Sequence, residues 1–417
     1  MLSHRVPGIV RASYAQSCMY GISPKLGFVG QSVSHGEHNR LAGCQRALTI
    51  GLIPGDGVGK EVIPVKHLVH SPPPAVFYVY FGAARRVLEA VLALTPTFVD
   101  LNAGFEHFQR TGTALPHTTI NSLRYECDGA LFGAVSSPSH QVKGYSSPIV
   151  QLRKELELFA NIRPVASPAK LDNGYKIDML IVRENTECLY IKSERIVTDP
   201  DTGLRTAWAD RKISEYACSR IAQVAFKQAT LRAKQRTGID DQPLAHQQSF
   251  HLYPKVTMVH KSNVLSVSDG LFRTSVKEVW SNTPAYKNAV HLDEQLVDSM
   301  VYRMFREPHI FDVVVAPNLY GDIISDAAAA LVGSLGVVGS ANVVHGSAPD
   351  ISGKGIANPI AAIRSAGLLL DYLGYSNESS KIYASVDRLL LSCHNLTPDL
   401  GGNGSTHKVT DAIIRDL

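Results

Sequence analysis

Short apolar runs alternate with longer helical patterns along this chain, and this alternation restricts the fold more than any other feature of the sequence. The runs expected to form strands occupy residues 48–53, 130–135, 179–182, 256–259 and 313–316. Apolar residues at helical spacing occupy residues 214–233, 267–280 and 323–335. Strands that alternate with helices predict an α/β fold with a largely parallel sheet.

A further helix is expected to begin near Ser146 and Ser147, because their hydroxyls suit an N-cap and Pro148 suits the first turn. Its apolar pattern extends to Phe159. Residues 65–82 interrupt another helical pattern with three consecutive prolines. Without this segment the flanking residues form one amphipathic helix, so we interpret 65–82 as an insertion, for example a translated intron.

Charge separates the first part of the chain from the rest. Residues 1–46 carry five basic residues, one acidic residue and six serines, and the remainder has equal numbers of basic and acidic side chains. This leader is typical of a mitochondrial transit peptide that is removed in the matrix, with a frayed tail as the alternative. The neutral body gives no electrostatic basis for binding nucleic acid.

No apolar stretch is long enough to span a membrane, and six dispersed cysteines indicate a reducing compartment.

The segment Gly55-Asp56-Gly57 follows the first expected strand. Its glycine spacing differs from that of a dinucleotide-binding fingerprint, and no acidic residue stands at the end of a second strand. A tight turn is therefore favoured over a phosphate-binding loop.

Three arginines, Arg153, Arg163 and Arg183, occur in the strings QLRKELELF, NIRP and IVRENTE. Guanidinium groups bind carboxylates in a bidentate manner, so together they would suit a substrate with several carboxylates. Structural salt bridges are an equal alternative from spacing alone.

Asp322 and Asp326 lie four residues apart near a helix start, which places both carboxylates on one helix face. Asp298 offers a further oxygen. Hard oxygen ligands without a histidine or cysteine cluster favour Mg²⁺ or Mn²⁺. The alternative is acidic side chains placed to complement the helix dipole.

Lys261 follows an expected buried strand, where active sites of α/β proteins form and where burial favours the neutral, basic amine. Tyr190 is a candidate partner acid, although either residue alone would more often be structural. A loop rich in glycine and small residues, with one carboxylate, suits an adenosine ribose better than a 2′-phosphate. That loop comprises His345, Gly346, Ser347, Ala348, Pro349 and Asp350, followed by Asn358.

These strings together resemble the β-decarboxylating dehydrogenases, the family of isocitrate, isopropylmalate and homoisocitrate dehydrogenases. The matching strings, in chain order, are IPGDGVGKEV, LRKELELFANIRP, RENTECLY, HKSNVL, NLYGDIISD and HGSAPDISGKGIANP. The resemblance covers nearly the whole chain after the leader. Around residues 129–165 it is strongest to the homoisocitrate-oxidising members.

The resemblance implies a two-domain isopropylmalate-dehydrogenase-like fold with mixed sheets flanked by helices and a nucleotide site unlike the Rossmann one. Residues 47–158 and 333–417 would form the nucleotide-binding domain. Residues 159–332 would form the domain for substrate, metal and dimerisation. It also implies a homodimer whose two active sites are shared between subunits.

The resemblance assigns roles residue by residue. The three arginines would hold the substrate carboxylates, and Tyr190 and the partner subunit's Lys261 would transfer protons. Asp322 and Asp326, with the partner subunit's Asp298, would bind Mg²⁺ or Mn²⁺. Asn263 would lie near substrate and nicotinamide, and the loop from His345 to Asp350 with Asn358 would hold the adenosine of NAD.

The resemblance also implies the reaction: oxidative decarboxylation of homoisocitrate to 2-oxoadipate in lysine biosynthesis. Ser146 and Ser147 stand where the family distinguishes its substrates, and hydroxyls at a helix N-terminus favour a distal carboxylate over an isopropyl group. Isocitrate stays open as a substrate. Two departures from the family pattern, the 65–82 insertion and a segment absent between residues 343 and 344, leave a non-catalytic subunit as the alternative.

Overall fold

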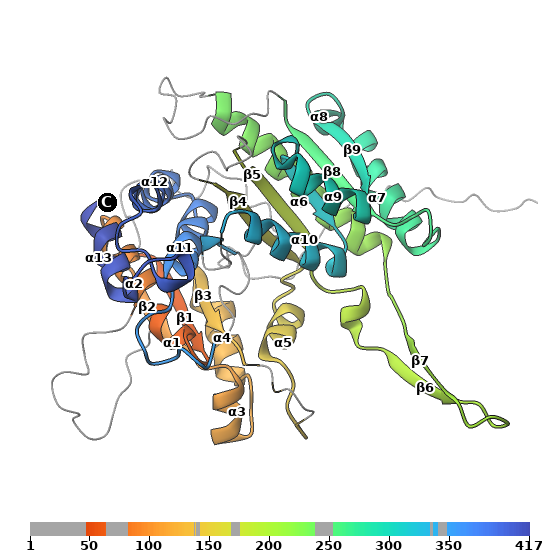
Figure 1. Ribbon diagram of the computed structural model, residues 1–417, viewed down its shortest axis with the longest axis horizontal. Coiled ribbons are helices and arrows are strands. Elements are labelled where there is room, and N and C mark those ends of the chain that lie inside the picture. The colour runs from red at the N-terminus through yellow and green to blue at the C-terminus, as the bar shows by residue number, and fades with distance from the viewer. Residues whose placement is uncertain are drawn as a thin grey trace, which may run out of the picture.

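The computed structural model describes residues 47–63, 82–136, 138, 142–167, 176–237, 253–333, 337–340 and 348–417. These residues form a three-stranded sheet, a five-stranded sheet and a two-stranded arm (Figure 1). Helices pack around the two larger sheets. The predicted α/β fold with mixed sheets flanked by helices is therefore confirmed.

The smaller sheet is parallel and has the strand order β2-β1-β3. Its strands are β1 (Thr49–Gly55), β2 (Thr97–Asp100) and β3 (Gly129–Ala134). The helices around it are α1 (Gly59–Val62), α2 (Ala83–Val91), α3 (Phe105–Thr111), α4 (His117–Tyr125), α11 (Ile360–Tyr372), α12 (Ser376–Ser392) and α13 (Thr406–Arg415). Chain segments from both ends of the sequence thus build this half of the molecule.

The larger sheet has the order β4-β5-β10-β8-β9, and only β4 runs antiparallel to its neighbour. Its strands are β4 (Ala160–Ala166), β5 (Asp178–Glu184), β8 (Lys255–His260), β9 (His291–Leu296) and β10 (Val313–Ala316). Its helices are α6 (Glu215–Thr237), α7 (Ser268–Asn282), α9 (Val297–Arg306) and α10 (Asn318–Leu331). Shorter elements are α5 (Pro148–Glu155), η2 (Leu189–Ile191), α8 (Pro284–Lys287), η3 (Pro308–Ile310) and η5 (Pro398–Leu400).

Alternation along β5 explains how the larger sheet is covered on both faces. Leu180 and Val182 pack in the apolar cluster that includes α6 and α7, whereas Met179 and Ile181 pack in the cluster that includes α9 and α10. Successive strand side chains point to opposite faces, so a strand covered on both sides is apolar throughout. The second cluster continues into the core of the smaller sheet. The predicted division at residues 158/159 and 332/333 stays a prediction.

The predicted bounds of three helices are wrong, and one of them, α6, extends to Thr237 instead of ending at residue 233. The helix expected at 323–335 begins earlier, at Asn318, because Pro317 directly follows β10, has no N–H for a strand ladder and marks a helix start. The helix after Ser147 ends at Glu155, so Phe159 lies outside it. Phe159 instead leads into β4 and packs with the α6 side of the larger sheet.

The helix interrupted by the proline-rich segment is present as two separate helices, α1 and α2. Val62 and Ile63 at the end of α1 and Val87 and Leu88 in α2 lie fully buried in the same core cluster. Residues 65–81 of the proposed insertion and the whole leader lie outside the described residues. Within the described residues, no helix is both long and apolar enough to cross a membrane.

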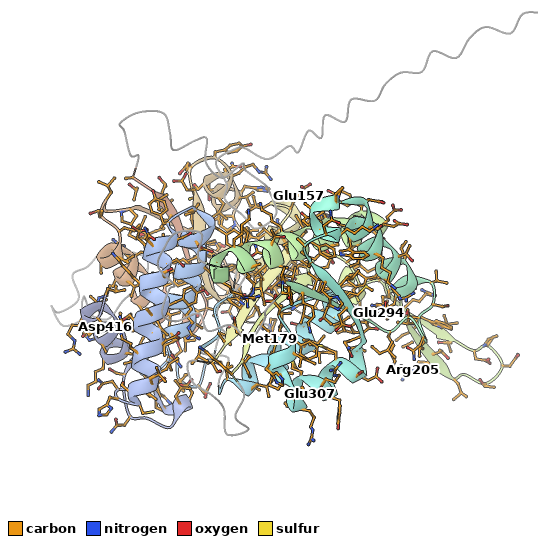
Figure 2. The ribbon with its side chains drawn as sticks, turned by 90° about the horizontal axis from the view of Figure 1, so that it is seen from above. Glu157, Met179, Arg205, Glu294, Glu307 and Asp416 are labelled. Carbon is orange, nitrogen blue, oxygen red and sulfur yellow. The ribbon has the colours of Figure 1, made fainter. Side chains whose placement is uncertain are left out.

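An antiparallel arm, β6 (Glu194–Thr198) with β7 (Arg205–Ala209), projects from the body of the molecule (Figure 1). Figure 2 shows Arg205 on this arm, away from Met179 in the larger sheet. Every residue of both strands is exposed, including Ile196 and Trp208. An isolated two-stranded hairpin is marginal in water, so this arm needs further contacts to be stable.

Candidate active site

The site is organised around Arg183, the penultimate residue of β5. Its neighbour β10 runs parallel and pairs Ala316 with Arg183, so the helix that follows β10 starts beside this side chain. Asn318, the first residue of α10, accepts hydrogen bonds from Arg183 Nε at 2.9 Å and Nη2 at 2.6 Å. Nη1 is paired with the carboxylate of Asp322. The guanidinium is buried and its charge is balanced within the site.

Gly321 allows α10 to approach Arg183 this closely. A Cβ at position 321 would lie 2.7 Å from both Cβ and Cγ of Arg183. Real Cβ contacts are longer than this, so any side chain at 321 must displace the arginine or the helix. The glycine in the string NLYGD therefore has a packing role.

Tyr190 meets the same carboxylate from the other side. Its hydroxyl donates to the second oxygen of Asp322, and its ring lies 5.2 Å from the Arg183 guanidinium carbon. Burial, followed by the hydrogen bond to Asp322, raises the pKa of the Tyr190 phenol above its ordinary value. Tyr190 is consequently a neutral proton donor throughout the neutral pH range.

The other two predicted arginines join this group. Arg163 on β4 is paired with Asp326 of α10. Burial, and then the nearby charge of Arg183, lowers the pKa of Arg153 to about 10, and Asp322, Tyr190 and Arg163 also act on Arg153 electrostatically. Three arginines, two carboxylates and a phenol therefore gather in one place, as a binding site for a substrate with several carboxylates would require.

Asp298 does not join these carboxylates within one chain. It lies at the start of α9, where its Oδ1 is 2.5 Å from Lys261 Nζ. In the described part of the chain, no group of three or more acidic, histidine or cysteine side chains is arranged to hold a metal ion. Asp322 and Asp326 supply two hard carboxylates on one helix face, so a three-carboxylate site needs an oxygen from elsewhere.

Lys261 stands directly after β8, as predicted, and its backbone is held in place. Its N–H donates to Oδ2 of Asp269 at 2.7 Å, and Asp269 is fully buried. Asn263 lies two residues further on, in an exposed turn. Burial lowers the pKa of the preceding His260, whose Nε2 is 3.9 Å from Glu294, so His260 is neutral near neutral pH.

Ser147 is the N-cap residue of α5, as predicted, with Pro148 in the first turn. Its hydroxyl makes no capping hydrogen bond to any residue that the structure describes. Tyr145, just before the serines, packs edge-on against Phe105 and Phe108 at centroid distances of 5.0 and 5.2 Å. The hydroxyl of Ser147 therefore follows an anchored residue and does not cap α5.

The turn predicted at Gly55-Asp56-Gly57 is confirmed. Both glycines have positive φ, +72° and +55°, and Asp56 is fully buried. Its carboxylate accepts backbone N–H groups of Phe105 and Glu106 at 2.9 Å and of Ser136 at 2.8 Å. Asp56 thus ties the end of β1 to α3 and to the exit of β3.

The predicted adenosine loop is described only in part. His345, Gly346 and Ser347 lie outside the described residues, as does the point where the family has additional residues. Asp350 is exposed in a turn, with Ala348 and Pro349 before it. Asn358 has a structural role, since its Nδ2 donates to Asp399 at 2.9 Å and its Oδ1 accepts the N–H of Ile360 at the start of α11.

Sequence reasoning missed several supporting residues. Asn318 orients Arg183, and Asp269 fixes the Lys261 backbone. Arg211 is paired with Asp269 in turn. The position of Asn318, immediately after a buried strand and before a helix, was a usable signal, whereas nothing local in the sequence marked Arg211.

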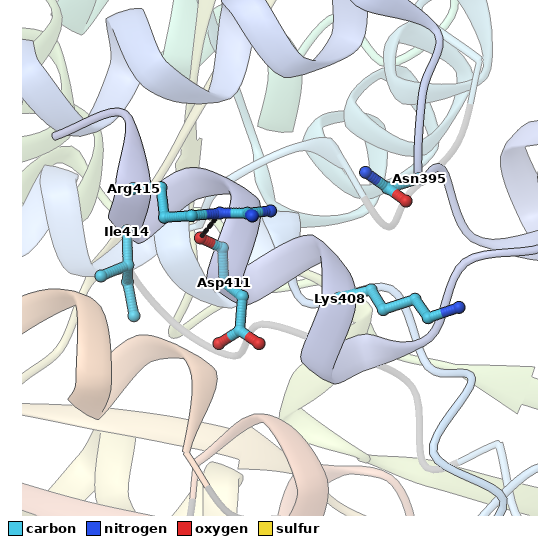
Figure 3. Close-up of a pocket in the computed structure, with 5 residues that line it drawn as sticks. All are labelled: Asn395, Lys408, Asp411, Ile414 and Arg415. Atoms are coloured by element: carbon cyan, nitrogen blue, oxygen red, sulfur yellow. Dashed lines mark hydrogen bonds between the residues drawn. The ribbon is translucent and has the colours of Figure 1, made fainter.

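A surface hollow of about 430 Å³ lies elsewhere, along α13 and the loop before η5 (Figure 3). It is lined by Asn395, Lys408, Asp411, Ile414 and Arg415, and Arg415 Nε donates to the Asp411 carbonyl. Asp411 is also paired with Arg86 of α2. None of its lining residues belongs to the arginine–carboxylate group.

Comparison with known proteins gives consistent matches over most of the chain. The family model described as isocitrate/isopropylmalate dehydrogenase matches residues 80–413. An isocitrate/homoisocitrate dehydrogenase of Thermus thermophilus is 40% identical over 380 residues, covering 89% of this chain and 99% of the relative. A homoisocitrate dehydrogenase of Methanocaldococcus jannaschii is 36% identical, covering 88% of this chain and 97% of the relative. A 3-isopropylmalate/3-methylmalate dehydrogenase of the same organism is 39% identical and covers 88% and 98%.

Solved structures agree with these matches. The crystal structure of an isocitrate dehydrogenase from Methylococcus capsulatus superposes with a TM-score of 0.71 at 30% identity, covering 89% of this chain and 99% of that one. A β-decarboxylating dehydrogenase from Thermococcus kodakarensis gives a TM-score of 0.67 at 34% identity, covering 88% and 96%. The names of these relatives differ in substrate, so the comparisons leave the substrate open.

Proposed function

This chain belongs to the isocitrate/isopropylmalate dehydrogenase family of β-decarboxylating dehydrogenases, and on that premise we propose that it oxidises homoisocitrate with NAD and decarboxylates it to 2-oxoadipate. The observation that carries the proposal is the gathering of Arg153, Arg163 and Arg183 with Asp322, Asp326 and Tyr190. Buried guanidinium groups bind carboxylates strongly and in fixed orientation. A substrate with three carboxylates can occupy all three arginines.

The chemistry divides between the chain and its cofactors. The arginines orient the hydroxy acid and offset charge that develops on it. Lys261 takes a proton from the hydroxyl during oxidation, and Tyr190 donates a proton to carbon after carbon dioxide leaves. When bound, NAD accepts the hydride, and the divalent cation acts as a Lewis acid.

The donor atoms fit a hard divalent cation, which family members generally use. Asp322 and Asp326 place two carboxylates one turn apart, and their present partners are arginines of the proposed substrate site. Carboxylate oxygens suit Mg²⁺ or Mn²⁺. We propose that the third carboxylate is Asp298 of the partner subunit.

The proposed dimer accounts for several exposed apolar side chains. Ile196, Leu204 and Trp208 on the arm are between half and three-quarters exposed, as are Tyr302 and Phe305 on α9, the helix that begins beside Lys261. Apolar groups on an unsupported hairpin are typical of an interface with a second copy. In such a dimer, Lys261 and Asp298 of one chain would complete the site of the other.

NAD in preference to NADP is supported by the exposed carboxylate of Asp350, since it can bind ribose hydroxyls and would repel a 2′-phosphate. The hydroxyl of Ser147, which does not cap α5, supports a substrate with a distal carboxylate.

The basic, serine-containing leader supports import into the mitochondrial matrix, where this step would serve lysine biosynthesis by the aminoadipate route.

The test is NADH formation, measured by absorbance, with Mg²⁺ and homoisocitrate, isocitrate or isopropylmalate in parallel. Homoisocitrate is expected to give the highest kcat/KM, and NADP should replace NAD poorly. A higher kcat/KM with isocitrate or isopropylmalate would replace the proposed substrate while leaving the reaction class intact. Well-folded protein that turns over none of the three would favour a non-catalytic subunit, the alternative raised by the 65–82 segment and the residues absent near 343.

A further inference from the structure

We propose that Arg211 is a positioning residue that holds both proton-transfer groups in place, Lys261 through Asp269 and Tyr190 through Cys188. The inference rests on the proposed function, because it assigns those two groups their roles. Arg211 lies between the arm and α6, outside the arginine–carboxylate group, and its side chain is 12% exposed. It would act on the proposed reaction through its neighbours.

The guanidinium of Arg211 joins three elements at once. Nη1 is paired with Asp269 and lies 3.3 Å from Ser268 Oγ, both at the start of α7. Nε donates to Cys188 Sγ at 3.1 Å. The guanidinium carbon also lies 4.9 Å from the ring centroid of Tyr320 in α10. A planar group with fixed donors can satisfy these partners together, which a lysine ammonium cannot.

On the Lys261 side the link is a single fully buried carboxylate. Asp269 uses Oδ1 for Arg211 and Oδ2 for the backbone N–H of Lys261, at 2.7 Å. A buried carboxylate that loses its cation is strongly disfavoured and must move or take up a proton. Loss of the ion pair between Arg211 Nη1 and Asp269 would therefore weaken the hold on the peptide from which Lys261 projects.

On the Tyr190 side the link is Cys188, which immediately precedes the short helix η2 that carries Tyr190. Cys188 has φ +69°, in the left-handed region that a non-glycine residue adopts only when its surroundings hold it there. Its N–H donates to the carbonyl of Lys212 at 2.8 Å, and its thiol accepts from Arg211. Residues 211–212 thus fix the backbone conformation that presents Tyr190.

In the proposed dimer this arrangement has a consequence for both sites. Tyr190 would serve the site of its own chain and Lys261 that of the partner. One guanidinium would then hold a proton-transfer group of each site, so a substitution of Arg211 would lower the activity of both active sites.

The first experiment compares Arg211→Lys with Arg388→Lys in the full-length protein. Arg388 on α12 is also paired with a carboxylate, since its Nε donates to Asp416 Oδ2 at 2.6 Å and its Nη2 donates to the Asp416 carbonyl at 3.1 Å, but its side chain is 47% exposed and remote from the site. Arg211→Lys keeps a positive charge in this position, but a lysine ammonium cannot bind Asp269 and Cys188 together as Nη1 and Nε of Arg211 do. We expect kcat to fall about 10- to 100-fold with KM changed less than about 3-fold, and the solvent deuterium isotope effect on kcat to rise, because misplaced acid–base groups slow proton transfer.

Arg388→Lys should leave kcat, KM and the isotope effect unchanged. A purely structural role for Arg211 would lower the melting temperature of Arg211→Lys without a selective loss of kcat, and that result would overturn the inference. An equal loss in both lysine variants would overturn it as well. Absence of turnover in wild-type protein would remove the proposed function itself, and the inference would fall with it.

Mixed dimers separate the two links. Chains with Tyr190→Phe and chains with Lys261→Met are combined, so that each mixed dimer keeps one complete site. Arg211→Lys is then added to one parent at a time. A loss of rate in both placements supports both links, and a loss in only one placement removes the other link. Wild-type rates in both placements refute the proposal.

Discussion

Adding a single methyl group at Gly321 should damage catalysis much more than stability. The Cβ of Gly321→Ala would lie 2.7 Å from Cβ and Cγ of Arg183, where ordinary contacts begin at 3.4 Å. Arg183 or α10 must therefore shift by roughly 0.7–1 Å, and a displacement of this size near reacting groups costs up to about 100-fold in rate. We expect kcat/KM to fall by about 10- to 100-fold.

The expected effect on stability is smaller because two contributions oppose each other. Overpacking costs about 1–3 kcal/mol, and replacing glycine by alanine inside a helix contributes about 1 kcal/mol in the other direction. The net loss in the free energy of unfolding should be no more than about 2 kcal/mol, measured by urea denaturation. Gly270→Ala in α7 is the matched control, since a Cβ there meets open space. It should stabilise slightly and leave kcat/KM unchanged.

The assay is NADH formation with homoisocitrate over a range of substrate concentrations, alongside the denaturation curves. If Gly321→Ala keeps kcat/KM within about 2-fold of wild type, the packing of α10 against Arg183 does not set the geometry of the site. That result would refute the inference that the position of Arg183 controls catalysis.

Three further predictions follow from the same geometry. Tyr190→Phe should lower kcat by about 10²- to 10⁴-fold with little effect on KM, measured by initial rates, because it removes one proton donor. Mg²⁺ should raise the melting temperature of the wild type, and this increase should be lost in Asp322→Asn and in Asp326→Asn; an undiminished shift in both variants would place the metal elsewhere. Hydrogen bonds from Arg273 and then Lys277, against an opposing effect of burial, lower the pKa of Glu294 from 4.5 to about 2, so its contribution to stability is present above pH 4.5 and lost as pH falls towards 2. Glu294→Gln should therefore be less stable than wild type at neutral pH and equal to it near pH 2 by thermal denaturation.

The sequence by itself determined the fold class and the chemical inventory of the site. Apolar strands covered on both faces have a local signature, and the run of four consecutive apolar residues at 313–316 predicted β10 to the residue. The i, i+4 spacing of Asp322 and Asp326 likewise follows from helix geometry alone. The spacing of the residues did not assign their individual roles, and the resemblance to the family motifs did.

Only the tertiary structure decided which of those residues meet. Asp322 faces Arg183 and Tyr190, whereas Asp298 is paired with Lys261 in the same chain. That separation depends on the strand order of the larger sheet, which no local pattern encodes. The role of Gly321 and the network at Arg211 were equally invisible in sequence, because close packing and buried charge pairs join residues that are far apart along the chain.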